Sequence, residues 1–413
     1  MAEKDQPIVY TAQATSPIVN GEVKLKINDN SFVATALFDV AEVPYVEVTS
    51  IEYNDYVVTV RTDGGNYVFT RMGQWAQPFY DNLCKSYAAA MVRAFFIVGK
   101  PDAKAVADYK FAEHGGSVSG NRVPAQVYET CVAGLPGNLN SRRIPLCFAV
   151  GMDKADHEVS LKVSNAYGGI DSYTFSRLGS DTNPFIDAID KNIRALRDKT
   201  IAVLKEIDPS LSMTQASQLA KLVPEGVAAP MGELKRIAPS FFAALEALIA
   251  KTRGGASYKA FKEVCDPAKI WVGFRKKNAN EEGTEVAAAA ENEEGEAAED
   301  AALEPFLFWM LVPSPCGRFA TIEFAEAKTA TFVYRTNGDF NTTAMQLNRA
   351  LEGIRFRRDV IRLTDKDLFK PENADYLLAA KRTASLGFIR ERFDTRLIHN
   401  DTWKKRLIET WSK

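Results

Sequence analysis

Histidines, the side chains best suited to proton transfer near neutral pH, are few and scattered in this sequence of 413 residues. Its three histidines are His114, His157 and His399, and no nucleophile elbow or other catalytic signature accompanies them. We therefore predict that each histidine has a surface or structural role and that the protein is not an enzyme. A Cys–His or Ser–His pair assembled by the fold is the open alternative.

The five cysteines indicate neither a metal site nor a disulfide framework. They form no CxxC motif, and no two Cys or His residues have the spacing of zinc ligands. An odd number of unclustered cysteines favours reduced thiols in a cytosolic protein. The start of the chain lacks the pattern of a signal peptide, and no stretch approaches the roughly 18 apolar residues of a spanning helix. The sequence thus predicts a cytoplasmic protein with no cofactor, no metal and no transmembrane segment.

Three residues are candidates for contact with a partner. Trp75 lies in a predicted loop, where an exposed tryptophan suits a protein interface. Arg142 and Arg143 are adjacent before a predicted strand, where two guanidinium groups could hold a carboxylate or a phosphate. The simpler interpretation of the two arginines is a solvated strand end.

A Gly/Ser-rich stretch, residues 113–122, could bind a phosphate through backbone N–H groups. It lacks the GK[ST] ending of a phosphate-binding loop, and Val123-Pro124 follows it instead of a helix start. We interpret it as a mobile linker between two domains.

The elements that would position these residues belong to a sequence repeat. Residues 67–81, YVFTRMGQWAQPFYD, and residues 173–187, YTFSRLGSDTNPFID, align without a gap and share seven of fifteen residues. Each copy predicts a strand, a glycine turn and a helix that opens with proline and phenylalanine, Phe79 or Phe185. A strand–turn–strand pattern precedes each copy. The chain therefore contains at least two related modules in which a hairpin leads into an amphipathic helix.

A third, weaker copy of the module is predicted near the end of the chain. Residues 319–324 and 330–335 form a hairpin pattern that precedes a helical one. An arginine ends the hairpin in every copy, at Arg71, Arg177 and Arg335. We interpret these arginines as structural, and an anion site in each module is the alternative. The expected partner is a carboxylate of the same module, such as Asp81 or Asp187.

Module one resembles the pleckstrin-homology-like (PH-like) fold, an antiparallel sandwich closed by a C-terminal helix. The resemblance rests on the order of its elements and carries no diagnostic motif. Modules two and three look shortened to about four strands, so we expect them to pack against each other. The strand candidates of module one are Ile8–Ala12, Glu22–Ile27, Phe32–Asp39, Tyr45–Tyr53, Tyr56–Thr62 and Tyr67–Arg71.

The remaining segments of the chain have helical patterns instead of hairpin patterns. Residues 208–263 have apolar residues at helical spacing broken by proline and glycine, which predicts two or three short helices. The end of the chain, from Thr364, predicts two more helices. The fold class is thus α+β, with repeated antiparallel sandwiches, a helical insertion and a helical tail. The predicted domains are 1–100 for module one, 120–206 for module two, 207–265 for the insertion, 266–357 for module three and 358–413 for the basic tail.

The formal net charge of −2 conceals a strong partition of charge. Residues 279–304 hold ten acidic residues and no basic one, which predicts a disordered acidic loop inside module three. Removing those ten charges from −2 leaves +8 on the rest of the chain. Residues 355–413 alone hold fifteen Lys and Arg against nine Asp and Glu.

These features favour a scaffold or interaction protein that binds a protein or peptide partner, because the resemblance implies binding far more often than catalysis. Lys24 and Lys26 lie on a candidate strand, but the next strand, Phe32–Asp39, carries no base. A phosphoinositide is therefore not expected as the ligand. The alternatives are binding of nucleic acid or an anionic surface through the basic C-terminal helices, and an enzyme of a type that the motifs do not reveal.

Overall fold

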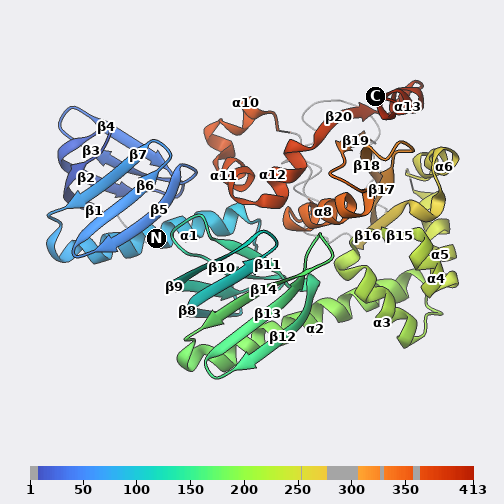
Figure 1. Cartoon of the computed structure of the whole chain (residues 1–413), viewed down its shortest axis with the longest axis horizontal. Coiled ribbons are helices and arrows are strands. Elements are labelled where there is room, and N and C mark those ends of the chain that lie inside the picture. The colour runs from blue at the N-terminus through green and yellow to red at the C-terminus, as the bar shows by residue number, and fades with distance from the viewer. Residues whose placement is uncertain (1–7, 253, 277–305, 326–329, 357–362) are drawn as a thin grey trace, which may run out of the picture. The chain divides into compact units, whose positions relative to one another are not determined.

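The protein is described by a computed structural model that covers residues 8–252, 254–276, 306–325, 330–356 and 363–413. The chain divides into two compact units (Figure 1). Unit one comprises residues 1–165, 170–190 and 353–387, and unit two comprises residues 166–169, 191–352 and 388–413. Helices and antiparallel sheets occur in both, which confirms the α+β class. The predicted acidic loop, 279–304, lies outside the described residues.

Module one is a seven-stranded antiparallel sheet followed by helix α1 (Ala76–Ala94). Alternate strand residues face inward, and the Phe32 and Phe69 side chains are fully buried. The strands are hydrogen-bonded in the order β4-β3-β2-β1-β7-β6-β5. Their bounds are β1 (Val9–Thr15), β2 (Asn20–Ile27), β3 (Ser31–Thr35), β4 (Val40–Pro44), β5 (Val48–Asn54), β6 (Val57–Thr62) and β7 (Gly65–Thr70).

Helix α1 covers the inner face of this sheet with the apolar stripe that its sequence predicts. Phe79, Leu83, Tyr87 and Met91 recur every four residues and are all fully buried. The prediction was wrong for residues 32–39, where one strand was expected. The chain instead turns after β3 and returns as β4, which adds a seventh strand to module one.

Module two repeats this arrangement with seven strands of its own, in the order β11-β10-β9-β8-β14-β13-β12, followed by helix α2 (Thr182–Ile207). The repeated residues occupy equivalent places and share an unusual backbone. Arg71 and Arg177 have φ of 58° and 59°, and Gly73 and Gly179 have φ of 54° and 58°. The strands are β8 (Ala103–Glu113), β9 (Gly116–Val127), β10 (Cys131–Gly134), β11 (Arg142–Pro145), β12 (Ala149–Ala155), β13 (Glu158–Ser164) and β14 (Ile170–Ser176).

Two predictions about module two were therefore wrong. Its first strand begins at Ala103 instead of after residue 120, and residues 113–122 are mostly strand, with a tight turn at His114–Gly115 instead of a linker. Gly115, with φ of 99°, allows that turn. Module two also closes its own core, since Phe111, Ile144, Leu161 and Phe175 are at most 1% exposed. It does not need module three as a second layer.

Unit two is built on a six-stranded sheet with the strands in the order β15-β16-β17-β18-β19-β20. The predicted hairpin and helix of module three are present as β18, β19 and α8 (Phe340–Gly353). Strand β20 comes from the predicted tail and pairs antiparallel with β19. It takes the place that β1 and β8 hold beside β7 and β14 in the first two modules. The strands are β15 (Ala229–Pro230), β16 (Trp271–Lys276), β17 (Phe306–Pro313), β18 (Phe319–Ala325), β19 (Ala330–Arg335) and β20 (Phe393–Ile398).

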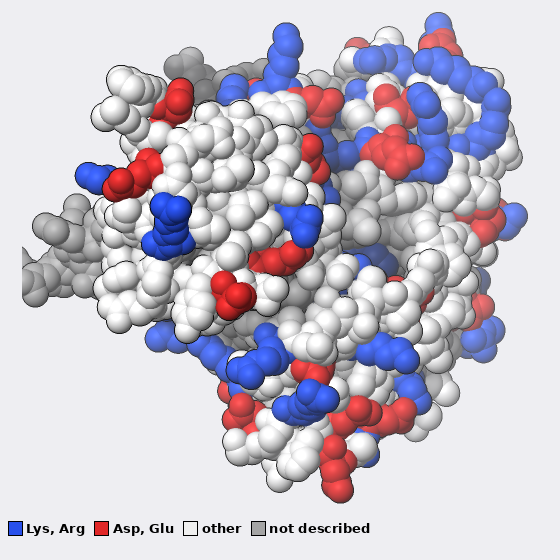
Figure 2. Space-filling view, turned by 60° about the vertical axis from the view of Figure 1, so that its left-hand side comes forward, with Lys and Arg blue, Asp and Glu red and all other residues white. Residues whose placement is uncertain are grey.

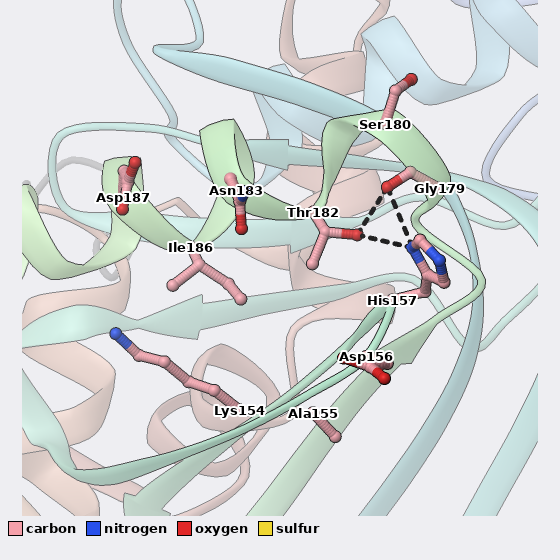
Figure 3. Close-up of a pocket in the computed structure, with 10 residues that line it drawn as sticks. All are labelled: Lys154, Ala155, Asp156, His157, Gly179, Ser180, Thr182, Asn183, Ile186 and Asp187. Carbon is pink, nitrogen blue, oxygen red and sulfur yellow. Dashed lines mark hydrogen bonds between the residues drawn. The ribbon is translucent and has the colours of Figure 1, made fainter.

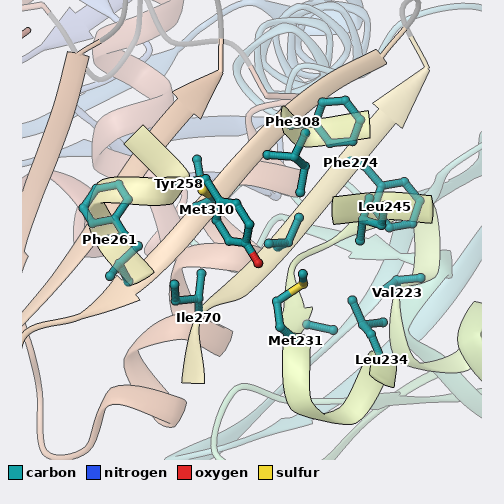
Figure 4. Close-up of a cluster of buried hydrophobic side chains, with 14 of the residues drawn as sticks. Val223, Met231, Leu234, Leu245, Tyr258, Phe261, Ile270, Phe274, Phe308 and Met310 are labelled. Atoms are coloured by element: carbon teal, nitrogen blue, oxygen red, sulfur yellow. The ribbon is translucent and has the colours of Figure 1, made fainter. Parts of the chain in front are cut away.

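The helical insertion shares one apolar core with this sheet (Figure 4). Phe241 and Leu245 of α5 and Phe261 of α6 are fully buried in the same cluster as Phe274 of β16 and Met310 of β17. The insertion is therefore part of unit two instead of a separate domain. Its α-helices in the described residues begin with a Ser212–Gln215 capping box at the first and are α3 (Met213–Leu222), α4 (Met231–Ile237), α5 (Pro239–Lys251) and α6 (Gly255–Val264).

The predicted basic tail is divided between the two units. Its first part lies in unit one, where the Arg93 guanidinium contacts Asp375 at 3.0 Å and Arg382 donates to the carbonyl oxygens of Val46 and Val48. Its last part, with β20, lies in unit two, so the prediction of two helices alone was wrong. The helices of the tail are α10 (Asp365–Leu368), α11 (Ala374–Arg382), α12 (Ala384–Glu391) and α13 (Trp403–Trp411).

Candidate functional site

A hollow of about 610 Å³ lies in module two beside the start of α2 (Figure 3). The His157 ring lies at its rim, with Nδ1 3.2 Å from the Gly179 carbonyl oxygen and 3.4 Å from Thr182 Oγ1. The Thr182 hydroxyl donates to the same carbonyl at 2.7 Å. These contacts fasten the β12–β13 turn to the helix, which supports the structural role expected for His157.

The hollow exists because two side chains of module two are smaller or more polar than their counterparts in module one. Lys154 and Ile186 line it, and the Lys154 ammonium contacts Asp190 at 2.5 Å. Tyr53 and Tyr80 hold the equivalent places in module one, with ring centroids 5.5 Å apart, and fill the space. The hollow is open and its one lysine is already paired, so it has no charge left to hold an anion.

A more enclosed group of polar side chains lies in unit two, around His399. Its Nε2 is 2.9 Å from Glu323 Oε1, and its Nδ1 is 3.5 Å from Ser257 Oγ. Glu323 is fully buried on β18, and its other oxygen accepts a hydrogen bond from Thr331 Oγ1 at 2.5 Å. Trp403 Nε1 donates to the same hydroxyl at 2.7 Å, and the His399 ring stacks on Trp403.

This constellation contains the residue types of a hydrolase triad, yet its geometry favours a structural role. Ser257 is 3% exposed, so a substrate has no approach to its hydroxyl. At 3.5 Å the contact with His399 is also too long for efficient proton transfer. The group instead joins β18, β19, the segment after β20 and α13 around one buried carboxylate. Sequence spacing could not reveal it, because Glu323 and His399 are distant along the chain.

The arginines that end the second and third hairpins form structural ion pairs, as the sequence predicts, but with other carboxylates than expected. Arg177 pairs with Asp108 on β8 at 3.1 Å, and Arg335 pairs with Asp394 on β20 at 2.9 Å. The partner is thus on the neighbouring strand and not on the following helix, where Asp81 or Asp187 was expected. In module one Gln13 holds the strand position of Asp108, since it lies opposite Thr70 as Asp108 lies opposite Ser176.

The two candidate arginines of module two are occupied within the chain. The Arg142 Nε lies 3.0 Å from both oxygens of Glu113, and Tyr173 donates to the same carboxylate. Arg143 follows on β11, where its neighbour's side chain points to the opposite face, and it too interacts within the chain. The prediction of a shared anion grip therefore fails for this pair.

Trp75 is the candidate whose side chain remains available. It is 54% exposed at the start of α1, with its ring 6.4 Å from that of buried Tyr10. Tyr10 is held in turn by Phe79, at 5.2 Å between rings, and by a hydrogen bond from Asn82 at 2.6 Å. Ile8, two residues before Tyr10, is 60% exposed. Trp75 thus presents an exposed ring that rests on a fixed aromatic base.

Cys316 is expected to react first when the native protein is treated with a small amount of iodoacetamide. All five cysteines are free thiols, and Cys316 is the exposed one. Partial burial raises the pKa of its thiol, but hydrogen bonds from Ser314 and Arg318 outweigh burial and lower the pKa. Burial raises the pKa of Cys84 to about 12 and that of Cys265 to about 11.

The thiolate is the form that reacts with iodoacetamide. Because the pKa of Cys316 is lowered, its alkylation rate should begin to increase at a lower pH than that of an ordinary thiol. Peptide mass spectrometry after brief labelling at several pH values measures this order, with Cys316→Ser as the control. Labelling of Cys84 before Cys316 would contradict the expectation.

Two comparisons with known proteins gave no family assignment for this chain. A scan against protein-family models found no match, and a search of curated proteins found none with significant similarity. None of the helices in the described ranges has the length and apolar character needed to cross a membrane.

Proposed function

We propose that this chain is a non-catalytic, cytoplasmic interaction protein that binds a protein or peptide partner through PH-like sandwiches. Two sheets with the same strand order, each followed by a covering helix, support the PH-like assignment. The free thiols support a reducing compartment. The observation that carries the proposal is Trp75, a half-exposed tryptophan on a rigid base. Tryptophans of this kind often supply a large part of the binding energy in protein interfaces.

Nucleic-acid binding by the tail is less well supported. The Arg382 guanidinium donates hydrogen bonds to two backbone carbonyl oxygens, and Lys404 pairs with Glu263. Lys370 pairs with Asp367 at 2.8 Å. These bases are therefore not gathered into a free cationic surface that could follow a phosphate backbone.

Trp75→Ala is expected to weaken partner binding at least tenfold, or about 1.4 kcal/mol, with little change in folding. The partner is first found by placing a photo-crosslinking phenylalanine analogue at position 75 in cells. The same analogue at Val106, which is 55% exposed on β8, is the matched control. The partner crosslinked at position 75 alone is then purified, and its dissociation constant is measured with wild type and with the alanine variant.

Equal affinities for wild type and Trp75→Ala would contradict the proposed site. Crosslinks of the same partner from both positions would show that proximity at position 75 is not specific.

A further inference from the structure

Two large apolar side chains of consecutive residues are exposed at the tip of the β3–β4 hairpin. Leu37 is 86% exposed and Phe38 is 90% exposed, while Ala36 N–H donates to the Asp39 carbonyl at 2.8 Å across the turn. The next residue, Val40, is 61% exposed. Since the turn is tied by a backbone hydrogen bond, these side chains are held outward on a defined element.

Charge near the tip argues against an anionic lipid surface as its target. Asp39 follows Phe38 directly, and Glu22 lies at the adjoining end of β2, where both carboxylates are exposed. Lys24 is the nearest base on that strand. The face drawn in Figure 2 has broad areas that lack charged side chains. A predominantly uncharged protein surface is therefore a better match for the tip than anionic head groups.

Module two shows what the equivalent hairpin connection can do. Its β10–β11 loop, residues 135–141, lies against the edge strand β5 of module one within unit one. The Ile51 N–H donates to the Gly137 carbonyl at 2.8 Å, and Asn138 forms a β-bridge with Ser50. A loop at this place in the sandwich thus docks on the edge strand of another sandwich.

The strand of module two that corresponds to β5 is β12, and its outer edge has no backbone partner within the described ranges. The two strands match in detail, because each forms an irregular pair at its start, between Val48 and Ser50 or between Ala149 and Gly151. Val150, inside that irregularity, is 58% exposed. An unpaired strand edge is a ready surface for a second chain.

We propose that the Leu37–Phe38 tip of one copy of this chain docks on the edge of β12 in a second copy. The contact repeats between chains the loop-to-edge contact that joins modules one and two within a chain. Each copy carries one tip and one edge, so the contact is head-to-tail and can continue to a third copy. This self-association is independent of the partner site at Trp75.

The test measures mass by analytical ultracentrifugation of the full chain as concentration rises to the millimolar range. Wild type is expected to gain mass continuously with concentration. The tip variant Leu37→Ser/Phe38→Ser and the edge variant Val150→Asp are each expected to stay monomeric. All three substituted side chains are more than half exposed, so folding should be retained, which circular dichroism checks.

Mixing the two variants separates this proposal from general stickiness. The edge variant keeps its tip and the tip variant keeps its edge, so an equimolar mixture is expected to form dimers and nothing larger. Val106→Asp makes the same charge change at a 55% exposed site on the same sheet and should associate like wild type. A wild type that stays monomeric throughout, or a mixture that stays monomeric, would overturn the proposal.

Discussion

Replacing Gly226 with alanine is expected to destabilise unit two by about 4 kcal/mol, which combines overpacking with left-handed backbone strain. Gly226 has φ of 79°, and a Cβ there would lie 1.7 Å from the carbonyl oxygen of Phe274 on β16. Phe274 is a buried member of the unit's core, so its backbone cannot move aside without disturbing that packing. Urea unfolding measures the loss.

Tryptophan fluorescence suits this measurement because four of the five tryptophans lie in unit two. The matched control is Gly168→Ala. Gly168 also has φ of 79°, but a Cβ there would meet nothing within 4 Å. Gly168→Ala introduces only the backbone strain, so it should lower the free energy of unfolding by about 1 kcal/mol. Equal losses for the two variants would show that the contact with β16 does not matter.

Removing the buried carboxylate of Glu323 is the second substitution with a large expected effect. Glu323→Ala should cost about 3 to 5 kcal/mol, because it removes the buried carboxylate that accepts from the Thr331 hydroxyl and lies 2.9 Å from His399 Nε2. The same chemical denaturation with fluorescence detection measures it. An exposed pair provides the contrast: Glu52→Ala breaks the contact with Arg61, both about half exposed, and should cost less than about 1 kcal/mol.

A double-mutant cycle shows whether the two groups act together. If Glu323 and His399 form one unit, Glu323→Ala/His399→Ala should cost clearly less than the sum of the single variants. The two substitutions should also loosen the packing of α13, since Trp403 stacks on His399 and donates to Thr331. Strict additivity of the two single losses would show that the contact contributes nothing to stability.

Residue type alone predicts a candidate contact residue but not whether its side chain is available to a partner. Trp75 was identified from a single feature, its position in a predicted loop, and its exposure agrees. Arg142 is a second candidate contact from the sequence, but the fold places Glu113 against it at 3.0 Å. An arginine's availability depends on which carboxylate the fold brings near, and that partner is 29 residues away in the chain. The exposed tip at Leu37 was missed because the segment matched a continuous strand.

The sequence by itself determined the local parts of this protein. Each repeated hairpin and its helix arise from neighbouring residues: a strand pattern, a glycine turn, a proline at the helix start and apolar residues every four positions. These signals are complete within some thirty residues, and the structure contains the elements where they were expected, from β6 to α1 and from β13 to α2.

Tertiary structure alone decided how distant segments complete each sheet. Strands β8 and β9 complete module two, and β20 joins β19 from 58 residues beyond the end of that strand. The residues of β20 match a helix as well as a strand, because period alone is ambiguous in so short a segment. The edge of β19 offers unpaired backbone groups, and pairing with them makes this segment a strand. The same long-range pairing brings His399 beside Glu323, so the buried polar group of unit two is a product of topology and not of spacing.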